Sequence, residues 1–390
     1  MKLFAQVGHG PGEKITVGLR ENLIQGAIFS PKDMSKESIA GRFSEIRRNY
    51  PDADILIDPQ FYASLHADSP LINIGNLSDW NSFRHYRKGE LEINKNIDLV
   101  LEAYFRDLAT IEVTGIIAPN IYISQSFDSR EAVIAKNFIR QARHACKTTK
   151  LPLYASLVIC REALQDNKEF EEFINDITVL DDRPDGFYII VGSRSSNARS
   201  DIYHTDIIAN WMMLNLSLSI NGFQVINGYS DIMTPFLGAA GGAAGATGWW
   251  SNLRMFSLDR FFPAGGGRLP IVRYLSKLLL NRITFSEKDA ISLFVPEIAN
   301  NLPHDSEYTP EPERAREVLQ SWEALSSLIE ELVNEDISDS LTKCEKAVRL
   351  AEDAYSQIAA NGKLLDHKSN DEHILPLIEG LKKFREKAEL

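Results

Sequence analysis

Polar side chains follow several apolar segments of this sequence, at points where they could do chemistry. Asp58 comes after the apolar run ILI and directly before a proline, Asn120 ends TGIIAPN, and Asn227 lies within FQVINGYS. A carboxylate could transfer a proton or attack a substrate, and an amide could orient a hydroxyl group or a base edge. These three residues therefore open the list of candidate site residues.

Three further titratable residues could serve as catalytic partners of Asp58, namely Glu162, Asp231 and His204. Two carboxylates that face each other across one binding site could perform acid–base or nucleophilic chemistry on a glycosidic bond, if their separation suits that reaction. His204, in DIYHTD, could act as a general acid or base. The structural alternatives are a turn-forming Asp58, a helix-capping Asp231 and a surface His204.

Arginines gather in the segments expected beside the same strand ends. The set comprises Arg161, Arg194, Arg199, Arg254 and Arg260. A guanidinium group matches the oxygens of phosphate or carboxylate, so converging arginines would suit an anionic ligand, whereas the alternative is a solvated rim. The predicted ligand-binding residues are Gln60, Asn120, Arg161, Arg194, Asn227, Tyr229, Gly245 and Gly248.

The stretch GGAAGATGWW, residues 241–250, supplies the two glycines in that list. Glycine would let backbone N–H groups approach a phosphate closely. Alternatively, a run of glycine and alanine lets a strand or helix pack tightly against bulky neighbours such as Trp249 and Trp250. Both readings stay open from the sequence.

Several well-defined chemistries lack their motifs. HEXXH and CxxC are absent, so we expect no metal, and neither GxxxxGK[ST] nor GxSxG occurs. No GxGxxG follows the first expected strand, as a dinucleotide-binding fold would require. We therefore expect no cofactor.

Strand-like and helix-like patterns alternate along most of the chain. The strand-like segments are 26–31, 53–60, 114–120, 151–159, 185–193 and 223–230. The glycine stretch and RLPIVRYL, residues 268–275, would supply a seventh and an eighth. This alternation predicts a parallel sheet, and eight strands would close a (β/α)₈ barrel; the alternative is an open, doubly wound parallel sheet. In a barrel, the candidate residues would meet at the carboxyl ends of the strands.

The sequence predicts two regions. Residues 1–303 would form the barrel, with an insertion at about 61–94 whose Trp80 and Phe83 would belong to a lid. Residues 304–390 contain three amphipathic helical patterns without strands and would form a helical appendage. Trp322 lies on the apolar stripe of the first helix, which must be covered by the barrel or by a second copy of the chain.

The net charge, apolar runs and cysteines of the whole chain limit the functions that are compatible with the sequence. A net charge of −12 argues against broad nucleic-acid or anionic-membrane binding, and no apolar run is long enough for a membrane span. Three scattered cysteines and no signal-peptide pattern favour the cytoplasm. We therefore expect an enzyme, a hydrolase or a transferase, that acts on a small polar ligand, either neutral or anionic: a sugar, nucleoside or nucleotide. The alternative is a non-catalytic barrel that recognises a ligand or a partner through its C-terminal helices, with a homodimer as one arrangement.

Overall fold

The computed structural model describes residues 1–147, 149–195, 202–263, 270–307 and 314–390. Eight parallel strands form a nearly closed barrel. In chain order they are β1 (Lys2–Val7), β2 (Gly26–Phe29), β3 (Asp54–Ile57), β4 (Ile116–Ala118), β6 (Leu153–Cys160), β7 (Gly186–Gly192), β8 (Gln224–Gly228) and β9 (Ala244–Thr247). Their hydrogen-bonded order is β3-β2-β1-β9-β8-β7-β6-β4, and the short β5 (Tyr122–Ile123) pairs with β6. The predicted (β/α)₈ barrel is confirmed, and the open doubly wound sheet is excluded.

Thr114 closes the ring between β3 and β4, the two ends of that order. Its backbone N–H donates to the carbonyl of Ile55 at 3.0 Å, and its side-chain oxygen accepts from the Ile55 N–H at 2.8 Å. A hydroxyl-bearing residue therefore satisfies edge groups that would otherwise lack a strand partner.

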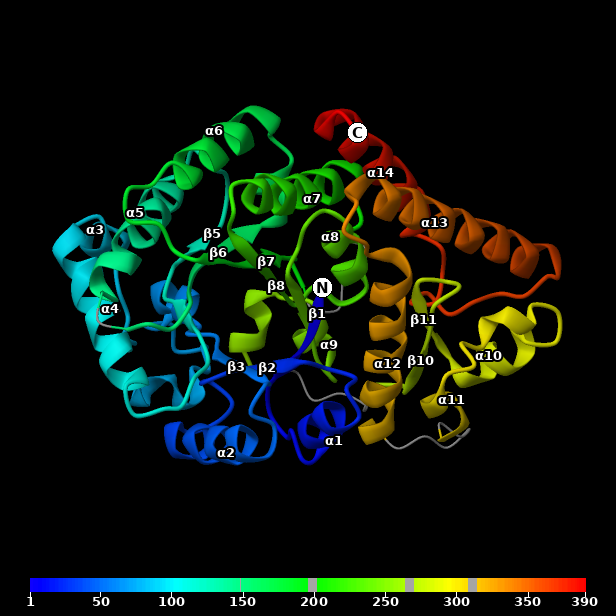
Figure 1. Cartoon of the computed structure of the whole chain (residues 1–390), viewed down its shortest axis with the longest axis horizontal. Helices are drawn as coiled ribbons and strands as arrows, with labels where there is room; N and C mark the ends of the chain where they lie inside the picture. Colours follow the sequence, from blue (N-terminus) through cyan, green and yellow to red (C-terminus); the bar gives the residue numbers. More distant parts are fainter. Residues whose placement is uncertain (148, 196–201, 264–269, 308–313) are drawn as a thin grey trace.

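Helices surround the strands (Figure 1). Those between successive barrel strands are α1 (Lys14–Arg20), α2 (Lys36–Asn49), α3 (Lys88–Leu91), α4 (Asn94–Leu108), α5 (Arg130–Ala145), α6 (Asn167–Thr178), α7 (Thr205–Ile220) and α8 (Thr234–Ala239). The helical spacing of Ile39, Phe43 and Ile46 buries one face of α2, and Ser35 caps its first turn by accepting from the Ser38 N–H. Sequence periodicity thus explains the inward faces of this layer.

One of the eight expected strands was assigned wrongly, and one barrel strand was missed. The first barrel strand is β1, at the N-terminus, and it pairs in parallel with both β2 and β9. The segment 268–275 supplies no barrel strand: its described part enters β10 (Arg273–Ser276), which forms an antiparallel hairpin with β11 (Asn281–Thr284) outside the barrel. Residues 268 and 269 lie outside the described ranges.

The long connection after β9 leads to the helix that fills the last place around the barrel. It contains α9 (Ser251–Arg254), the hairpin, α10 (Phe285–Ile291) and α11 (Pro303–Glu307), and ends at α12 (Arg314–Leu332). Helix α12 contacts α8, α1 and β1 (Figure 1). Its Trp322 is fully buried, and the indole N–H donates to the carbonyl of Thr247 on β9 at 3.2 Å. Trp322 therefore packs against the barrel.

The remaining two helices, α13 (Ile337–Ala360) and α14 (Ile374–Ala388), occupy the segments predicted from their patterns. Helix α14 lies along α7, where a Cβ atom at Gly380 would come within 2.8 Å of the Ile208 Cβ. This contact explains why α7 is buried on almost every side. In the described part of the chain, none of the helices combines the length and apolar character needed to cross a bilayer.

The insertion is folded into short helices. It contains η1 (Phe61–His66), η2 (Gly75–Asp79) and α3. Trp80 and Phe83 are both buried, and the Trp80 ring packs on Tyr104 of α4 with ring centroids 5.7 Å apart. These two side chains are part of the core, so they do not form the surface of an open lid.

Candidate functional site at the carboxyl ends of the strands

Asp58, directly after β3, lies at the centre of a buried polar cluster. One carboxylate oxygen accepts from the Gln60 N–H at 3.1 Å, and the other accepts from three phenols: Tyr62 at 2.9 Å, Tyr188 at 3.4 Å and Tyr229 at 3.3 Å. Asp58 has no exposed surface. Burial raises the pKa of the Asp58 carboxyl, outweighing the hydrogen bonds and the Arg260 charge, which favour ionisation.

Two backbone features allow the tyrosines to reach Asp58. At Gly228 a Cβ atom would lie 2.5 Å from the Tyr188 hydroxyl, so only glycine leaves room for that phenol in the barrel. Tyr229 itself has a φ of 54°, in the left-handed region that non-glycine residues adopt at a cost. The chain thus turns sharply where β8 ends, and this turn directs Tyr229 inward.

Arg260 ties this cluster to the end of β2. Its guanidinium donates to the Tyr229 phenol and to the Asp33 carboxylate, the latter at 3.0 Å. Burial lowers the pKa of Arg260, but Tyr229, Tyr62 and Asp33 more than offset this, so the pKa is raised and the cation persists. Phe256, in the same segment, packs on Tyr62 and Tyr229 with centroids 5.0 and 5.4 Å apart. The segment 256–261 therefore covers the barrel centre.

A second charged group lies two residues beyond Tyr229. Asp231, also with a positive φ, forms a two-pronged ion pair with Arg282 of β11 and accepts from Thr247 at 2.8 Å. Burial raises the pKa of Asp231, but Arg282 and Arg254 outweigh it, so the pKa is lowered and the carboxylate stays ionised. Asp58, which contacts Tyr229, and Asp231, two residues after Tyr229, therefore have pKa values shifted in opposite directions.

A cavity of about 290 Å³ opens beside this turn, at the ends of β8 and β9. Its wall combines aromatic, apolar and charged side chains from the barrel, the β10–β11 hairpin and residues 366–368. Arg254 donates to Glu317 of α12 at 2.9 Å, and burial together with the neighbouring Arg282 lowers the Arg254 pKa. Trp249 and Trp250 also line the cavity. Loops after the seventh and eighth strands are a common ligand position in such barrels.

The predicted amides turn away from this cavity. Asn120 donates to the carbonyls of Ser156 and Ala135 and accepts from the Ile121 N–H, and Asn227 is bonded to Trp211 and Asn215 of α7. Both side chains join strand ends to helices. Gln60 lies at the barrel centre, where its carbonyl accepts from the Lys32 N–H at 2.9 Å.

The other predicted residues occupy the rim. Glu162 pairs with Arg161 and Arg194, each at 3.1 Å, and hydrogen bonds and these charges lower its pKa although burial opposes the change. His204 caps α7, since its Nδ1 accepts from the Asp206 N–H at 3.3 Å. Arg199 lies outside the described residues.

The glycine stretch forms β9 and its flanks, with close packing at both candidate glycines. A Cβ atom at Gly245 would lie 2.4 Å from Thr234 Cγ2, and one at Gly248 would lie 2.4 Å from the Gln6 carbonyl oxygen. The geometry matches the packing reading of this stretch. Neither glycine is among the residues that line the cavity.

Sequence reasoning missed four residues that shape the site: Tyr62, Tyr188, Arg282 and Glu317. Tyr188 lies in a strand buried on both faces, where an unbroken apolar run hides which side chains face the interior. Arg282 and Glu317 come from segments far along the chain, and no local pattern marks them.

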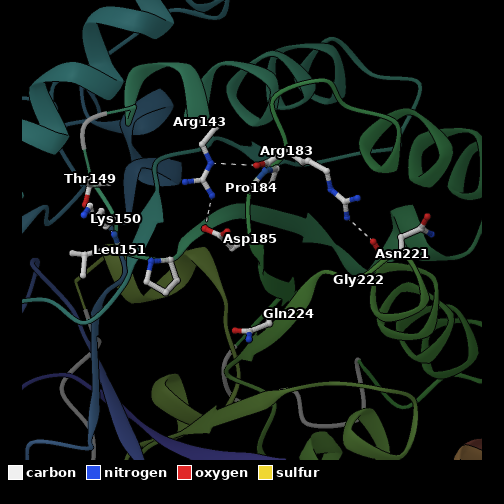
Figure 2. Close-up of a pocket in the computed structure, with 11 residues that line it drawn as sticks. Arg143, Thr149, Lys150, Leu151, Arg183, Pro184, Asp185, Asn221, Gly222 and Gln224 are labelled. Carbon is white, nitrogen blue, oxygen red and sulfur yellow. Dashed lines mark hydrogen bonds and ion pairs between the residues drawn. The ribbon is translucent and has the colours of Figure 1, made fainter.

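A larger, open pocket of about 910 Å³ lies at the opposite end of the barrel. Here Arg143 bonds Asp185 and the carbonyl of Arg183, and Arg183 donates to the carbonyl of Asn221 (Figure 2). These bonds join the segments that precede β7 and β8. Residues at the amino ends of barrel strands generally serve stability, so we do not place the site there.

No metal centre is indicated by the described side chains, since no group of three or more His, Cys, Asp or Glu residues there could hold an ion. The arginines and tyrosines instead suit a ligand with oxygen atoms.

Comparison with family models and with curated proteins gives no match. Among solved structures, the chain is similar to a mandelate racemase/muconate lactonizing family protein from Azoarcus sp. EbN1 (12% identity, 68% of this chain and 52% of that chain, TM-score 0.31). It is also similar to a glycoside hydrolase family 3 β-N-acetylglucosaminidase from Paenibacillus sp. str. FPU-7 (9% identity, 96% of this chain and 66% of that chain, TM-score 0.40). A third similar structure is dihydrodipicolinate synthase from Oceanobacillus iheyensis (11% identity, 98% of this chain and 96% of that chain, TM-score 0.25).

The chain spans about half the length of the racemase-family chain. Identities and TM-scores this low say nothing of activity. The class is set by the strand order: this is a (β/α)₈-barrel protein with additional C-terminal helices.

Proposed function

We propose that this protein is an enzyme that acts on a small ligand carrying both a ring and an anionic group, such as a sugar phosphate or a nucleotide. One observation carries the proposal: two largely buried arginines, Arg254 and Arg282, lie in the wall of a cavity beside the seventh and eighth barrel strands. Arginine forks suit phosphate or carboxylate oxygens, and the tryptophans offer flat apolar faces for a ring.

The two aspartates support acid–base chemistry at this end of the barrel. The raised pKa of Asp58 favours a proton-carrying carboxyl, and the lowered pKa of Asp231 favours an ionised one. Opposite shifts in a pair of carboxyl groups are typical of an acid and its ionised partner. Cleavage or transfer at a glycosidic bond, by a hydrolase or a transferase, is the reaction class that we propose.

Calorimetry with inorganic phosphate, sugar phosphates, nucleosides and nucleotides tests the proposal. We expect at least one phosphorylated compound to bind, and Ile271→Trp to abolish this binding, because exposed Ile271 lines the cavity and a larger ring there would fill it. Val179→Trp is the matched control, since Val179 is an exposed β-branched residue that does not line the cavity. Failure of all phosphorylated compounds to bind, or equal binding by both variants, would refute the proposal.

A second candidate function is a non-catalytic barrel that recognises a partner. It is favoured by the covering of the barrel centre: Asp58 is fully buried beneath Tyr62 and Phe256. The C-terminal helices would then be the docking surface. Binding of a partner with no turnover of any bound small molecule would favour this function over the enzyme.

The cytoplasm remains the proposed setting. Cys146, Cys160 and Cys344 are unpaired and buried, and burial raises the pKa of the Cys160 thiol to about 11. Such thiols are suited to a reducing environment.

A further inference from the structure

Buried polar groups without a protein partner surround Asp58 at the barrel centre. The side-chain amides of Gln6 and Gln60 and the Nε–H of Arg260 have no acceptor among the described residues, and the same holds for the Ser30 hydroxyl. All four residues are at least nine-tenths buried. Buried donors almost always bond to something, so these groups mark places for oxygen atoms that the protein itself does not provide.

Three of these residues, Gln6, Gln60 and Arg260, belong to one hydrogen-bonded network. Gln6 accepts from Tyr188 at 3.3 Å, Tyr188 contacts Asp58, and the Gln60 N–H also contacts Asp58. Arg260 joins the same network through Tyr229. Gln6, Gln60 and Arg260 are thus bonded to Asp58 directly or through one tyrosine. Ser30 follows β2 beside Asp58, since the preceding residues Phe29 and Ile57 are paired. We call these five residues the barrel chamber: Gln6, Ser30, Asp58, Gln60 and Arg260.

The charges of the chamber already have partners. Arg260 pairs with Asp33, and the Asp58 carboxyl is surrounded by phenols. A second full charge would thus be unpaired at the chamber, where burial makes it costly. An uncharged group that both donates and accepts hydrogen bonds can bond to the amide N–H groups, the hydroxyl and the carboxyl of the chamber without burying an unpaired charge.

The chamber and the arginine cavity share two stretches of chain. Tyr229 faces the chamber whereas Ser230 and Asp231 line the cavity; likewise, Phe256 covers the chamber whereas Arg254 and Met255 line the cavity. One elongated ligand could therefore occupy both, provided that the covering segment, held by the Arg260–Asp33 pair, moves aside for entry.

We propose that the barrel chamber binds the hydroxyl groups of an uncharged sugar ring, as the polyol half of the ligand whose anionic half occupies the arginine cavity. This inference rests on the proposed function and names the substrate class of the same site: a phosphorylated sugar or nucleoside. Hydroxyl oxygens accept from the amides of Gln6 and Gln60 and from Arg260, and hydroxyl protons are donated to Asp58 or Ser30.

Two glutamine variants separate a binding role from a packing role. Gln6→Met and Gln60→Met remove the unpartnered amide N–H groups while keeping similar volume. They also remove the carbonyl oxygens that accept from Tyr188 and from the Lys32 N–H, so the melting temperature should fall modestly in both variants. Saturation-transfer NMR with D-ribose and D-glucose should show binding of at least one sugar to the unaltered protein. The binding should weaken by about tenfold in each variant, as expected for one or two lost hydrogen bonds.

Gln320→Met is the matched control, because Gln320 is also fully buried but bonds both the N–H and the carbonyl of Leu275. It should lower the melting temperature and leave sugar binding unchanged. The proposal is overturned if neither sugar binds, or if binding is unchanged in both chamber variants.

Inorganic phosphate distinguishes this inference from the proposed function. Phosphate binding that is blocked by Ile271→Trp, without any sugar binding, would retain the arginine cavity and reject the sugar chamber. Sugar binding that depends on Gln6, without phosphate binding, would retain the sugar chamber and reject the arginine cavity.

Discussion

The phenol oxygen of Tyr229 lies 3.3 Å from a carboxylate oxygen of Asp58, although the two residues are 171 positions apart in sequence. Each follows a barrel strand, and parallel strands bring their carboxyl ends to one rim. The positive φ of Tyr229 directs its ring inward, and two residues later Asp231 joins the cavity wall. This turn links the buried carboxyl group to the cavity.

Asp58→Asn tests the raised pKa of the buried carboxyl. The native pKa lies above the unfolded value of about 3.8, so the proton stabilises the native state below that value, and the benefit is lost as pH rises through the native pKa. The free energy of unfolding of the unaltered protein, minus that of Asp58→Asn, should therefore fall as the pH of urea titrations rises above about 4.

Glu162→Gln serves as the control of opposite sign. The native pKa of Glu162 is lowered, so its contribution is present above the unfolded value of about 4.5 and is lost as pH falls. A difference for Asp58→Asn that rises with pH, as expected for Glu162→Gln, would mean that Asp58 is ionised in the native protein.

Arg282→Met should destabilise the protein by about 3–5 kcal/mol at pH 7, because it leaves the Asp231 carboxylate without its two-pronged partner. The loss should shrink as pH falls below about 4, where Asp231 takes up a proton. Urea unfolding at both pH values measures it. The double variant Arg282→Met/Asp231→Asn should recover part of the loss; equal losses in the single and double variants would contradict an ion-pair effect.

Gly380→Ala tests the contact between α14 and α7. Alanine stabilises an open helix position by roughly 1 kcal/mol relative to glycine. At Gly380, however, a Cβ atom would lie within 2.8 Å of Ile208, so we expect a net loss of about 1–3 kcal/mol in the free energy of unfolding. Gly41→Ala, on α2 with no atom within 4 Å, should instead stabilise. Stabilisation by both substitutions would show that α14 does not lie this close to α7.

Trp322→Ala tests whether α12 is an integral wall of the barrel. The indole is fully buried and bonds the carbonyl of Thr247, so its removal should cost about 3–5 kcal/mol in chemical denaturation. Glu330→Ala, at an exposed position of the same helix, should change stability by less than about 0.5 kcal/mol. Similar, small effects of the two substitutions would show that α12 is held only loosely.

The sequence predicted the barrel because alternating strand and helix periods carry the architecture, but it missed β1. The polar Gln6 interrupts the apolar run of KLFAQV, and in the structure this residue faces the polar chamber. The departure from the strand pattern therefore occurs at a residue of the proposed site, where local pattern and global fold are expected to disagree.

The candidate residues were predicted from their positions after strands. Those positions do not show whether a side chain points into the barrel or out of it. Asp58 and Tyr229 face the barrel centre, whereas Asn227 bonds Trp211 of α7 on the outside. When strands are buried on both faces, neither side shows a polar alternation that would separate the two. Arg282 illustrates a second limit, because its partner Asp231 lies 51 positions away and no local period connects them.

The pairing of β1 with β9 has a consequence for synthesis on the ribosome. Lys2 is made long before its strand partner Ala244, and Trp322, which covers that part of the wall, is made later still. One edge of β1 therefore keeps its N–H and C=O groups unpaired until β9 has been made, which exposes the nascent chain to wrong pairing. The barrel can close only after β9 and α12 have been made, so β1 must be kept from wrong pairing until then.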